Sequence, residues 1–526
     1  MTRLELRRRH LLAAALSAGL AAADTANGQD NAAKAGTRRR LTVGMSGFPP
    51  ALEPVLYNHT ATRRVVPQMF DTLIGFDHAR NMALRPALAE RWERIGATAL
   101  RLHLRRDVVF HDGGPFTAED VAFSLGPDHL LGPDRAGRSI AMQTLERIEK
   151  VEIVDPHTVV VHAKAGDALL EQRLAAWASE IVSKRAFAGV GSWERWTAAP
   201  VGTGPYRLVS QKLDTNVVLA PHDAYWGGKP AFDGIEFRIV PELATRLNGL
   251  YTGQLDVITD VPPDQFAEIR QRPALEVAGG AVQNIRFLAI DAETPGLTDP
   301  RARRALSLAI DRKLFVDSLW DNRVPVPNGF QLPSFGAGYI EDHPALAYDP
   351  DKARQLLKEA GYKGEPIAYR LLNNYYTNQV SGAQVMVEMW RAVGLNVRIE
   401  MMENFSQIQK KPVQAIYDTS STAVFPDYLG HAWREFGPNG TLPRQVGIWR
   451  NEEHFALGMR LQETYDADER RKLLRRMLEI IDRDDPPCVV LHVSGQFYGK
   501  RRDVPWIPGQ TLDLDFGPFN QAFSRT

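Results

Sequence analysis

The chain of 526 residues contains a single cysteine, Cys488, so no disulfide can form within it. Cys488 lies in the apolar stretch PPCVVLHVSG, which predicts a buried, unreactive thiol rather than a catalytic nucleophile. A chain of this length can bury enough apolar surface to fold without disulfides, but it is too long for one compact core. Two or three domains are therefore expected, with clefts between them.

An excess of charge of either sign is also missing, because Lys and Arg total 63 and Asp and Glu total 63. A balanced composition gives no indication of a nucleic-acid partner or of a membrane surface. Hydrophobic residues make up 44% of the chain and charged residues 24%, as in globular proteins and unlike disordered or fibrous ones. We expect a globular protein that does not bind nucleic acid.

The short motifs of common enzymes and metal sites are absent. The sequence has neither a G-x-S-x-G nor an H-E-x-x-H segment, and its 13 histidines are scattered. The glycines of VGTGPY are not followed by the Lys-Ser/Thr pair of a phosphate-binding loop. We expect no catalytic residues, no metal site and no cofactor. A pair of carboxylates acting as a glycosidase site is the alternative that the motifs leave open.

The chain also has no hydrophobic run at its N-terminus long enough to cross a membrane. The uncharged run from Leu11 to Ala23 has 13 residues, short of the ~20 that a bilayer requires. It follows a basic region and precedes small residues, so residues 1–23 are predicted to be a cleaved secretory signal peptide. Arg8-Arg9 is typical of a twin-arginine signal, with an ordinary Sec signal as the alternative. No cysteine follows the run, so a lipid anchor is not expected.

The polar stretch 24–40 predicts a disordered leader, and regular structure is expected from LTVGM onward. From there, short β-like runs alternate with amphipathic helices, which is typical of an α/β protein. Alternating apolar residues predict a strand within 98–110, and two β-branched runs joined by Asp155-Pro156-His157 predict a hairpin over 151–163. Helices are predicted over 65–76, 299–320, 349–362 and, before Gly394 and a strand, from residue 382 onward.

The stretch VVFHDGGPFTAEDVAFSL contains the residues most easily mistaken for a functional pair, His111 and Asp112. We interpret Asp112-Gly113-Gly114 as a turn and His111 as a hydrogen-bond partner that anchors it. Thr117 is the predicted N-cap of the following helix, with Asp120 completing a capping box. Tyr225 and Trp226, which precede a double glycine, predict a packed loop rather than a binding cage.

Several segments, in order along the chain, resemble the extracellular solute-binding proteins of family 5. These proteins are the dipeptide-, oligopeptide- and nickel-binding components of ABC importers. The resemblance rests on residues 88–125, which include the stretch above, on 199–240 with VGTGPY and DAYWGGKP, on LNGLYTGQLDVI, and on 300–320 followed by 348–362.

The resemblance implies an α/β, two-lobed periplasmic binding protein fold, class II-like, with an extra inserted domain and a hinge between the lobes. Domain I comprises 41–66, 196–284 and 489–526, and domain II, the insert, comprises 67–195. These two form one lobe, and domain III, residues 285–488, forms the other. The two chain crossings, near residues 284 and 488, would form the hinge. The turn-rich C-terminal stretch from residue 503 onward is expected to pack back on an earlier domain.

In the peptide-binding members, an Asp of a W-x-x-D-Y segment in domain III pairs with the α-ammonium group of the ligand. The matching stretch is STAVFPDYLGHAWREF, which places Asp427 and Tyr428 on the Asp-Tyr pair. A carboxylate in a water-poor cleft suits an ammonium ion. Val424-Phe425-Pro426 replace the usual Trp and Gly, so the alternative is that Asp427 only caps a turn.

Other candidate ligand contacts follow from the same resemblance. The loop SGFPPALEP after the first strand would line the cleft, and tyrosines in LLNNYYTNQ and aromatic residues around Asp427 would add rigid contact area. A guanidinium on the strand after the first crossing could bind a carboxylate through two hydrogen bonds. Packed loop residues and a surface salt bridge are the structural alternatives. The candidates are Ser46, Gly47, Phe48, Arg286, Tyr375, Tyr376, Phe425, His431 and Trp433.

The implied function is capture of a small solute in the periplasm and its delivery to the permease of an inner-membrane ABC transporter. A short peptide or peptide-like compound is the first choice of ligand, and an opine, an oligosaccharide or a metal chelate is the alternative. The ligand would favour a closed state through contacts to both lobes. The implied protein is a monomer. A secreted hydrolase or chaperone on the same fold is the alternative from another class.

Overall fold

The computed structural model describes residues 40–55, 60–80, 82–373 and 375–519. Their main feature is a mixed sheet in which ten strands follow the order β14-β13-β15-β12-β16-β11-β1-β10-β9-β8. In that order the strands are Asn396–Met402, Pro366–Leu372, Ala415–Thr422, Leu275–Ile290, Cys488–Arg501, Val257–Ile258, Arg40–Met45, Gly234–Ile239, Asn216–Pro221 and Tyr206–Lys212.

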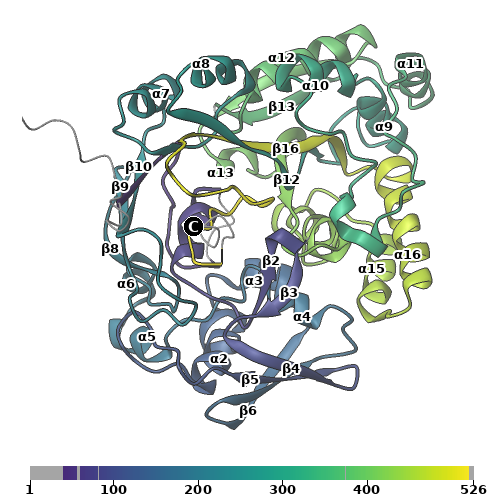
Figure 1. Ribbon diagram of the computed structural model, residues 1–526. Helices are drawn as coiled ribbons and strands as arrows, with labels where there is room; N and C mark the ends of the chain where they lie inside the picture. The colour runs from purple at the N-terminus through teal and green to yellow at the C-terminus, as the bar shows by residue number, and fades with distance from the viewer. Residues whose placement is uncertain (1–39, 56–59, 81, 374, 520–526) are drawn as a thin grey trace, which may run out of the picture. The chain divides into compact units, whose positions relative to one another are not determined.

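The two longest strands, β12 and β16, run antiparallel to each other at the middle of this sheet (Figure 1). The first half of β12 pairs with the end of β16, and its second half pairs with the beginning. Between Ala281 and Ile285 the register shifts, so that three residues of β12 lie opposite one residue of β16, Ser494. Such an irregularity bends a strand pair. The expected crossing near residue 284 falls within this irregularity, and Cys488 begins β16.

Residues 67–195, expected to form an insert, carry two smaller sheets. A four-stranded antiparallel sheet has the order β4-β5-β7-β6, and a two-stranded hairpin pairs β2 with β3. The predicted strand at 98–110 is β5, and the predicted hairpin at 151–163 is β6 and β7. The bounds are Ala89–Ile95 (β4), Ala99–Leu104 (β5), Thr158–Ala163 (β7), Ile148–Asp155 (β6), Ile74–Asp77 (β2) and Ala83–Pro86 (β3).

Two predicted helices differ from the structure. The helix predicted over 65–76 is wrong: Val66–Gln68 form one 3₁₀ turn (η1), and the apolar residues that follow form β2. Ile74 is buried in the core and Phe76 packs partly buried against it, while the backbone of β2 pairs with β3, which local periodicity could not reveal. The helix predicted over 299–320 is two helices, α9 (Pro300–Leu308) and α10 (Arg312–Trp320), because the Asp311 side chain caps a new helix.

Other predicted elements are confirmed. Helix α11 (Pro350–Glu359) starts after the N-cap Asp349 with Pro at its first position. Helix α12 (Gln379–Ala392) is followed by Gly394, whose φ of +93° suits glycine, and then by β14, which pairs in parallel with β13. The remaining α-helices are Thr60–Val65 (α1), Ala118–Ser124 (α2), Arg138–Leu145 (α3), Leu170–Arg173 (α4), Lys184–Val190 (α5), Trp193–Ala198 (α6), Leu243–Tyr251 (α7), Phe266–Arg270 (α8), Phe405–Ile408 (α13), Ala432–Phe436 (α14), Glu452–Glu463 (α15) and Ala467–Glu479 (α16).

The capping box is also confirmed, because the Asp120 carboxylate accepts a hydrogen bond of 3.0 Å from the backbone N–H of Thr117 at the start of α2. His111 anchors its turn as expected, with Nε2 3.0 Å from the carbonyl oxygen of Gly204. Burial lowers the pKa of His111 to about 3, so its ring is neutral. Gly204 is needed here, since a Cβ on it would lie 2.5 Å from the backbone of Met69.

The C-terminal stretch from residue 503 packs on an earlier part of the chain, as predicted. Trp506, Leu514 and Phe516 are buried together with side chains of β1, β9 and β10. Cys488 is buried as well, and burial raises the pKa of its thiol well above the ordinary value, which fits the predicted inert thiol.

The predicted signal peptide and leader up to residue 39 lie outside the described residues. Within the described ranges, no helix is both long and apolar enough to cross a membrane.

Candidate functional site

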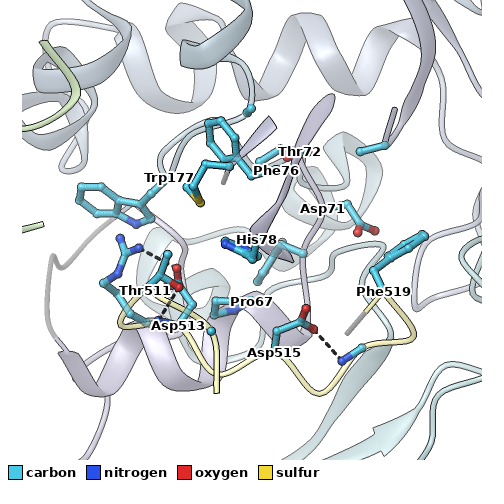
Figure 2. A pocket seen from close by; sticks show the side chains of 18 of the residues that line it. Pro67, Asp71, Thr72, Phe76, His78, Trp177, Thr511, Asp513, Asp515 and Phe519 are labelled. Atoms are coloured by element: carbon cyan, nitrogen blue, oxygen red, sulfur yellow. Dashed lines mark hydrogen bonds and ion pairs between the residues drawn. The ribbon is translucent and has the colours of Figure 1, made fainter. Parts of the chain in front are cut away.

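The structure contains a cavity of about 670 Å³, called here the large cavity. Three stretches that are distant in sequence form most of its lining: residues within 62–87, which include parts of α1, η1 and the β2–β3 hairpin, residues 175–180, and the C-terminal stretch 507–519. Pro205, Tyr225, Ala423 and Val424 also line it. In Figure 2 the ring of Trp177 lies at one end of this cavity, and Asp71 and Phe519 lie at the other.

Asp71 is held rigidly in the cavity wall by three neutral donors. The hydroxyls of Tyr225 and Thr203 and the indole N–H of Trp226 donate to its carboxylate at 2.9, 2.9 and 3.0 Å. Burial raises the pKa of Asp71, although these hydrogen bonds oppose the shift. The loop of Tyr225 and Trp226 is thus the predicted packed loop, and its structural task is to position an acidic side chain.

Arg63, on α1, has a partner for only one of its three guanidinium nitrogens among the described residues. Its Nη2 lies 2.8 Å from a carboxylate oxygen of Asp513, while its Nε and Nη1 are buried without a hydrogen-bond partner. The side chain is 6% exposed. A buried donor without an acceptor is costly, because its lost hydration is not replaced. Two guanidinium nitrogens of a residue that lines the cavity therefore have no acceptor among the described residues.

Glu180 is an acidic counterpart of Arg63 in the same cavity lining. Its carboxylate accepts a hydrogen bond of 2.9 Å from the backbone N–H of Ala178, and no basic side chain forms an ion pair with it in the described part of the chain. Burial raises the pKa of Glu180 to about 7, while the positive charge of Arg63 opposes the shift. The lining has an acidic excess overall: it contains Asp71, Asp77, Glu180, Asp513 and Asp515 against Arg63, Arg85 and His78.

A second cavity of about 30 Å³ brings together three of the predicted ligand residues, Arg286, Tyr375 and Tyr376. The Arg286 guanidinium forms a buried ion pair with Asp418 and stacks over the Tyr376 ring, with its central carbon 3.3 Å from the ring centre. Arg286 therefore forms neither the surface salt bridge nor a free carboxylate site. A space of this size holds about one water molecule, too little for a peptide.

Of the predicted residues of the first loop, Ser46 contacts a residue that lines the small cavity. The Ser46 hydroxyl donates to Asp260 at 2.8 Å, and Asp260 lines the small cavity. Asp260 is ion-paired with Arg64, which holds the pKa of its carboxyl at a very low value against the effect of burial. Phe48 packs against the apolar core that includes β1, and Gly47 has open space where a Cβ would stand. None of the three lines the large cavity.

The predicted residues that lie in the 425–436 segment are buried. Asp427 begins a 3₁₀ turn, Tyr428–Gly430 (η6), by accepting from the N–H of Leu429, and it forms an ion pair of 2.6 Å with Arg470. The turn-capping alternative therefore describes what Asp427 does in this structure. Phe425, Tyr428, His431 and Trp433 are all at most 2% exposed, and none of the five lines either cavity.

Three of these buried residues have hydrogen-bond partners elsewhere in the protein, although Nδ1 of His431 has none among the described residues. The Tyr428 hydroxyl lies 3.0 Å from Nε2 of His454, and Nε2 of His431 lies 2.9 Å from the carbonyl oxygen of Ser421. The Trp433 indole donates at 3.0 Å to Glu146, a residue at the end of α3. Their contact with a ligand remains a prediction, and the contacts seen are with other parts of the protein.

Sequence motifs do not predict the residues that line the large cavity, which include Arg63, Asp71, Trp177, Glu180 and Asp513. No local motif marks them, since each stands in an ordinary stretch of an α/β chain. The acids alternating with apolar residues in TLDLDFG were the only available signal.

The family of the chain follows from comparison with known proteins. A profile of the bacterial extracellular solute-binding proteins, family 5, matches residues 83–433, which is more than half of the chain. The chain belongs to this family. The resemblance inferred from the sequence is thereby confirmed.

Named relatives of this solute-binding protein cover much of its length. A probable di/tripeptide-binding protein 5 of Pseudomonas aeruginosa (strain UCBPP-PA14) is 28% identical over 69% of this chain and 72% of its own. Heme-binding protein A of Haemophilus influenzae (strain ATCC 51907 / DSM 11121 / KW20 / Rd) is 30% identical over 60% of each chain.

The fold is confirmed by solved structures. The dipeptide-binding protein of Pseudoalteromonas sp. SM9913, solved in complex with Met-Leu, matches with a TM-score of 0.82 at 20% identity, over 92% of this chain and 99% of its own. The two-lobed periplasmic binding protein fold is therefore that of this solute-binding protein. Within the described residues, no three His, Cys, Asp or Glu side chains converge in a way that could hold a metal ion.

Proposed function

We propose that this solute-binding protein captures a short peptide or peptide-like compound in the large cavity and delivers it to the permease of an ABC importer. The cavity carries the proposal. Its volume of about 670 Å³ falls in the range of small-molecule sites, roughly 300–1,000 Å³. Aromatic walls and incompletely paired charges of both signs suit a compound with apolar side chains and charged ends. Two of the relatives named above carry di- or tripeptides in their names, which supports this class.

The setting of this function is the periplasm. The basic residues and short apolar run before residue 24 support export with removal of residues 1–23, by the twin-arginine or the Sec route. The lack of a cysteine at that site supports a protein without a lipid anchor. We propose a monomer that binds its ligand without converting it.

Ligand capture requires movement between the two lobes, and the irregular pairing at Val282–Asn284 offers a place for it. There three residues of β12 lie opposite a single residue of β16, Ser494, so the regular pairing of the two strands is interrupted. We propose the hinge at this point, in both strands at once, with domain I on one side and domain III on the other. Regular pairing on both sides keeps each part of the sheet rigid.

Filling the cavity tests the function. Val424→Trp adds a large side chain at the cavity wall, so we expect affinity for dipeptides to fall by at least about tenfold in isothermal titration calorimetry. Val209→Trp on β8, where the side chain is 55% exposed, is the matched control and should leave affinity unchanged.

The natural ligand can be sought by native mass spectrometry of protein taken from its own periplasm. Release of a peptide would support the proposal, while release of an opine, an oligosaccharide or a metal chelate would replace the peptide by that class. Equal dipeptide affinity of the two valine variants would show that the large cavity is not the binding site.

A further inference from the structure

We propose that Glu180 binds the ammonium group of a zwitterionic ligand while the unpaired edge of Arg63 binds its carboxylate. This inference rests on the proposed function, because it assumes that the ligand lies in the large cavity. It adds the two side chains that would distinguish a zwitterionic compound from a neutral one.

The first observation is the state of Arg63. A guanidinium offers five N–H donors in a fixed planar arrangement, and a carboxylate matches two of them at once. Asp513 occupies one nitrogen, Nη2, and leaves Nε and Nη1 buried without acceptors. Because the side chain is 6% exposed, water replaces little of the missing hydrogen bonding. A ligand carboxylate would complete this set.

The second observation concerns the surroundings of Glu180. Among the described residues, no basic side chain forms an ion pair with its carboxylate. The nearby charged groups that act on it are Arg63, which favours its ionised form, and Glu53, which opposes it. Glu53 is itself held by the Trp196 indole, at 2.5 Å, with His129 at 3.5 Å, so it cannot turn to the cavity without losing both contacts. The other charged groups of the lining are Asp71, Asp77, His78, Arg85, Asp513 and Asp515.

An ammonium ion brought by the ligand would supply the missing positive charge. Arg63 forms an ion pair with Asp513. Arg85 donates hydrogen bonds to the carbonyl oxygens of Phe76 and Pro86, and its guanidinium stacks on the Phe519 ring. Neither arginine forms an ion pair with Glu180. A carboxylate in such a place is stabilised strongly by a charge-assisted hydrogen bond.

The chemistry predicts that binding releases a proton. Without ligand, burial holds the pKa of Glu180 at about 7, so near pH 6 most molecules carry a proton there. An ammonium ion at the carboxylate lowers this pKa, and the proton leaves as the ligand binds. Affinity should therefore rise with pH below 7, by up to about tenfold per pH unit, and level off above 7. It should fall again once the ligand amine itself loses its proton, near pH 8.

The probe is the dipeptide Met-Leu, compared with N-acetyl-Met-Leu, which lacks the ammonium group. For the wild-type protein at pH 7.5, we expect acetylation to weaken binding by at least about tenfold in calorimetry. Glu180→Gln should bind the two compounds with similar affinity and should show no rise in affinity between pH 5.5 and 7. Glu180→Asp, which keeps a carboxylate, should restore part of the rise.

Glu119→Gln on α2 is the matched control. Glu119 is exposed and paired with Lys184, outside both cavities, so its loss should leave the pH dependence unchanged. Circular dichroism and thermal unfolding would show that each variant is folded.

The possible results distinguish failure of the proposed function from failure of the role of Glu180 alone. If wild-type protein binds neither Met-Leu nor its acetylated form, or if Val424→Trp binds Met-Leu as tightly as the wild type, the proposed function fails, and the role of Glu180 fails with it. If Met-Leu binds in the cavity but acetylation has no effect, or Glu180→Gln keeps the pH dependence, only the role of Glu180 is overturned.

Discussion

The large cavity and the 425–436 segment are two acidic, aromatic-rich regions of the same protein. They differ in how completely their polar side chains are paired with other protein groups. In the segment, the side chains of Asp427, Tyr428 and Trp433 all have protein partners. The buried side-chain atoms of the segment without a partner among the described residues are single nitrogens of His431 and Arg434, which form hydrogen bonds through other nitrogens. In the cavity, Glu180 has no cationic partner among the described residues, and two nitrogens of Arg63 have no acceptor.

Under the proposed function, this difference separates polar groups that stabilise the protein from those that would bind its ligand. A buried polar group that already has partners adds stability only while the partners stay, so its loss should reduce stability. A buried polar group that lacks hydrogen-bond partners in the protein can form those hydrogen bonds with a bound ligand. We therefore expect variants of the segment to change stability with little effect on affinity, and variants of the cavity to do the reverse.

The largest effect is expected for Trp433→Ala. The indole is 2% exposed, donates to Glu146, and packs so closely on α15 that a Cβ on Gly458 would lie 1.9 Å from its ring. Loss of a buried tryptophan leaves a cavity and should lower the free energy of unfolding by about 3–5 kcal/mol, as measured by urea denaturation. Dipeptide affinity of the folded variant should not change. A stability loss below 1 kcal/mol together with a tenfold loss of affinity would make this residue part of the binding site.

The second effect is a loss of stability in acid. Burial lowers the pKa of His431, His454 and His492 to about 3, while the same residues titrate near 6.5 in the unfolded chain. Between those values the unfolded state binds more protons. The free energy of unfolding should therefore be constant above about pH 6.5 and fall as the pH is lowered from 6.5 towards 3.

Each such histidine contributes a slope of at most about 1.4 kcal/mol per pH unit. His454→Gln removes one titrating group from the segment's surroundings, so its unfolding curve, measured in urea at pH 4, 5, 6 and 7, should have a shallower slope than that of the wild type. An unchanged slope would mean that His454 is charged in the folded protein.

Most of the fold could be predicted because local signals suffice for it. Asp349-Pro350 and Gly361 mark the ends of one helix, and Thr117 with Asp120 marks the start of another. The stretch 65–76 was mispredicted because its apolar residues fit a helix and a strand equally, and only pairing with β3 decides between them.

The proposed ligand site could not be predicted in the same way. Arg63 and Glu180 are more than a hundred residues apart, and their importance depends on which of their neighbours remain unpaired in the folded chain. The similarity of its surroundings to a family segment predicts Asp427 as the residue that binds the ligand ammonium group. That similarity could not reveal Arg470, which lies 43 residues further along and occupies its carboxylate.

The smallest effect, and the sharpest test of the comparison, is expected for Asp427→Asn. The asparagine side chain can still accept from the N–H of Leu429 but loses the ion pair with Arg470, whose guanidinium keeps hydrogen bonds to the carbonyl oxygens of Leu461 and Thr464. A partly buried ion pair of this kind is worth about 1–2 kcal/mol, so urea denaturation should show a loss of that size. Affinity for Met-Leu should stay within a factor of two, because the carboxylate is already used by the protein. If affinity instead fell tenfold while stability stayed the same, Arg470 would have to release Asp427 to the ligand, and the amine site would belong to the 425–436 segment rather than to Glu180.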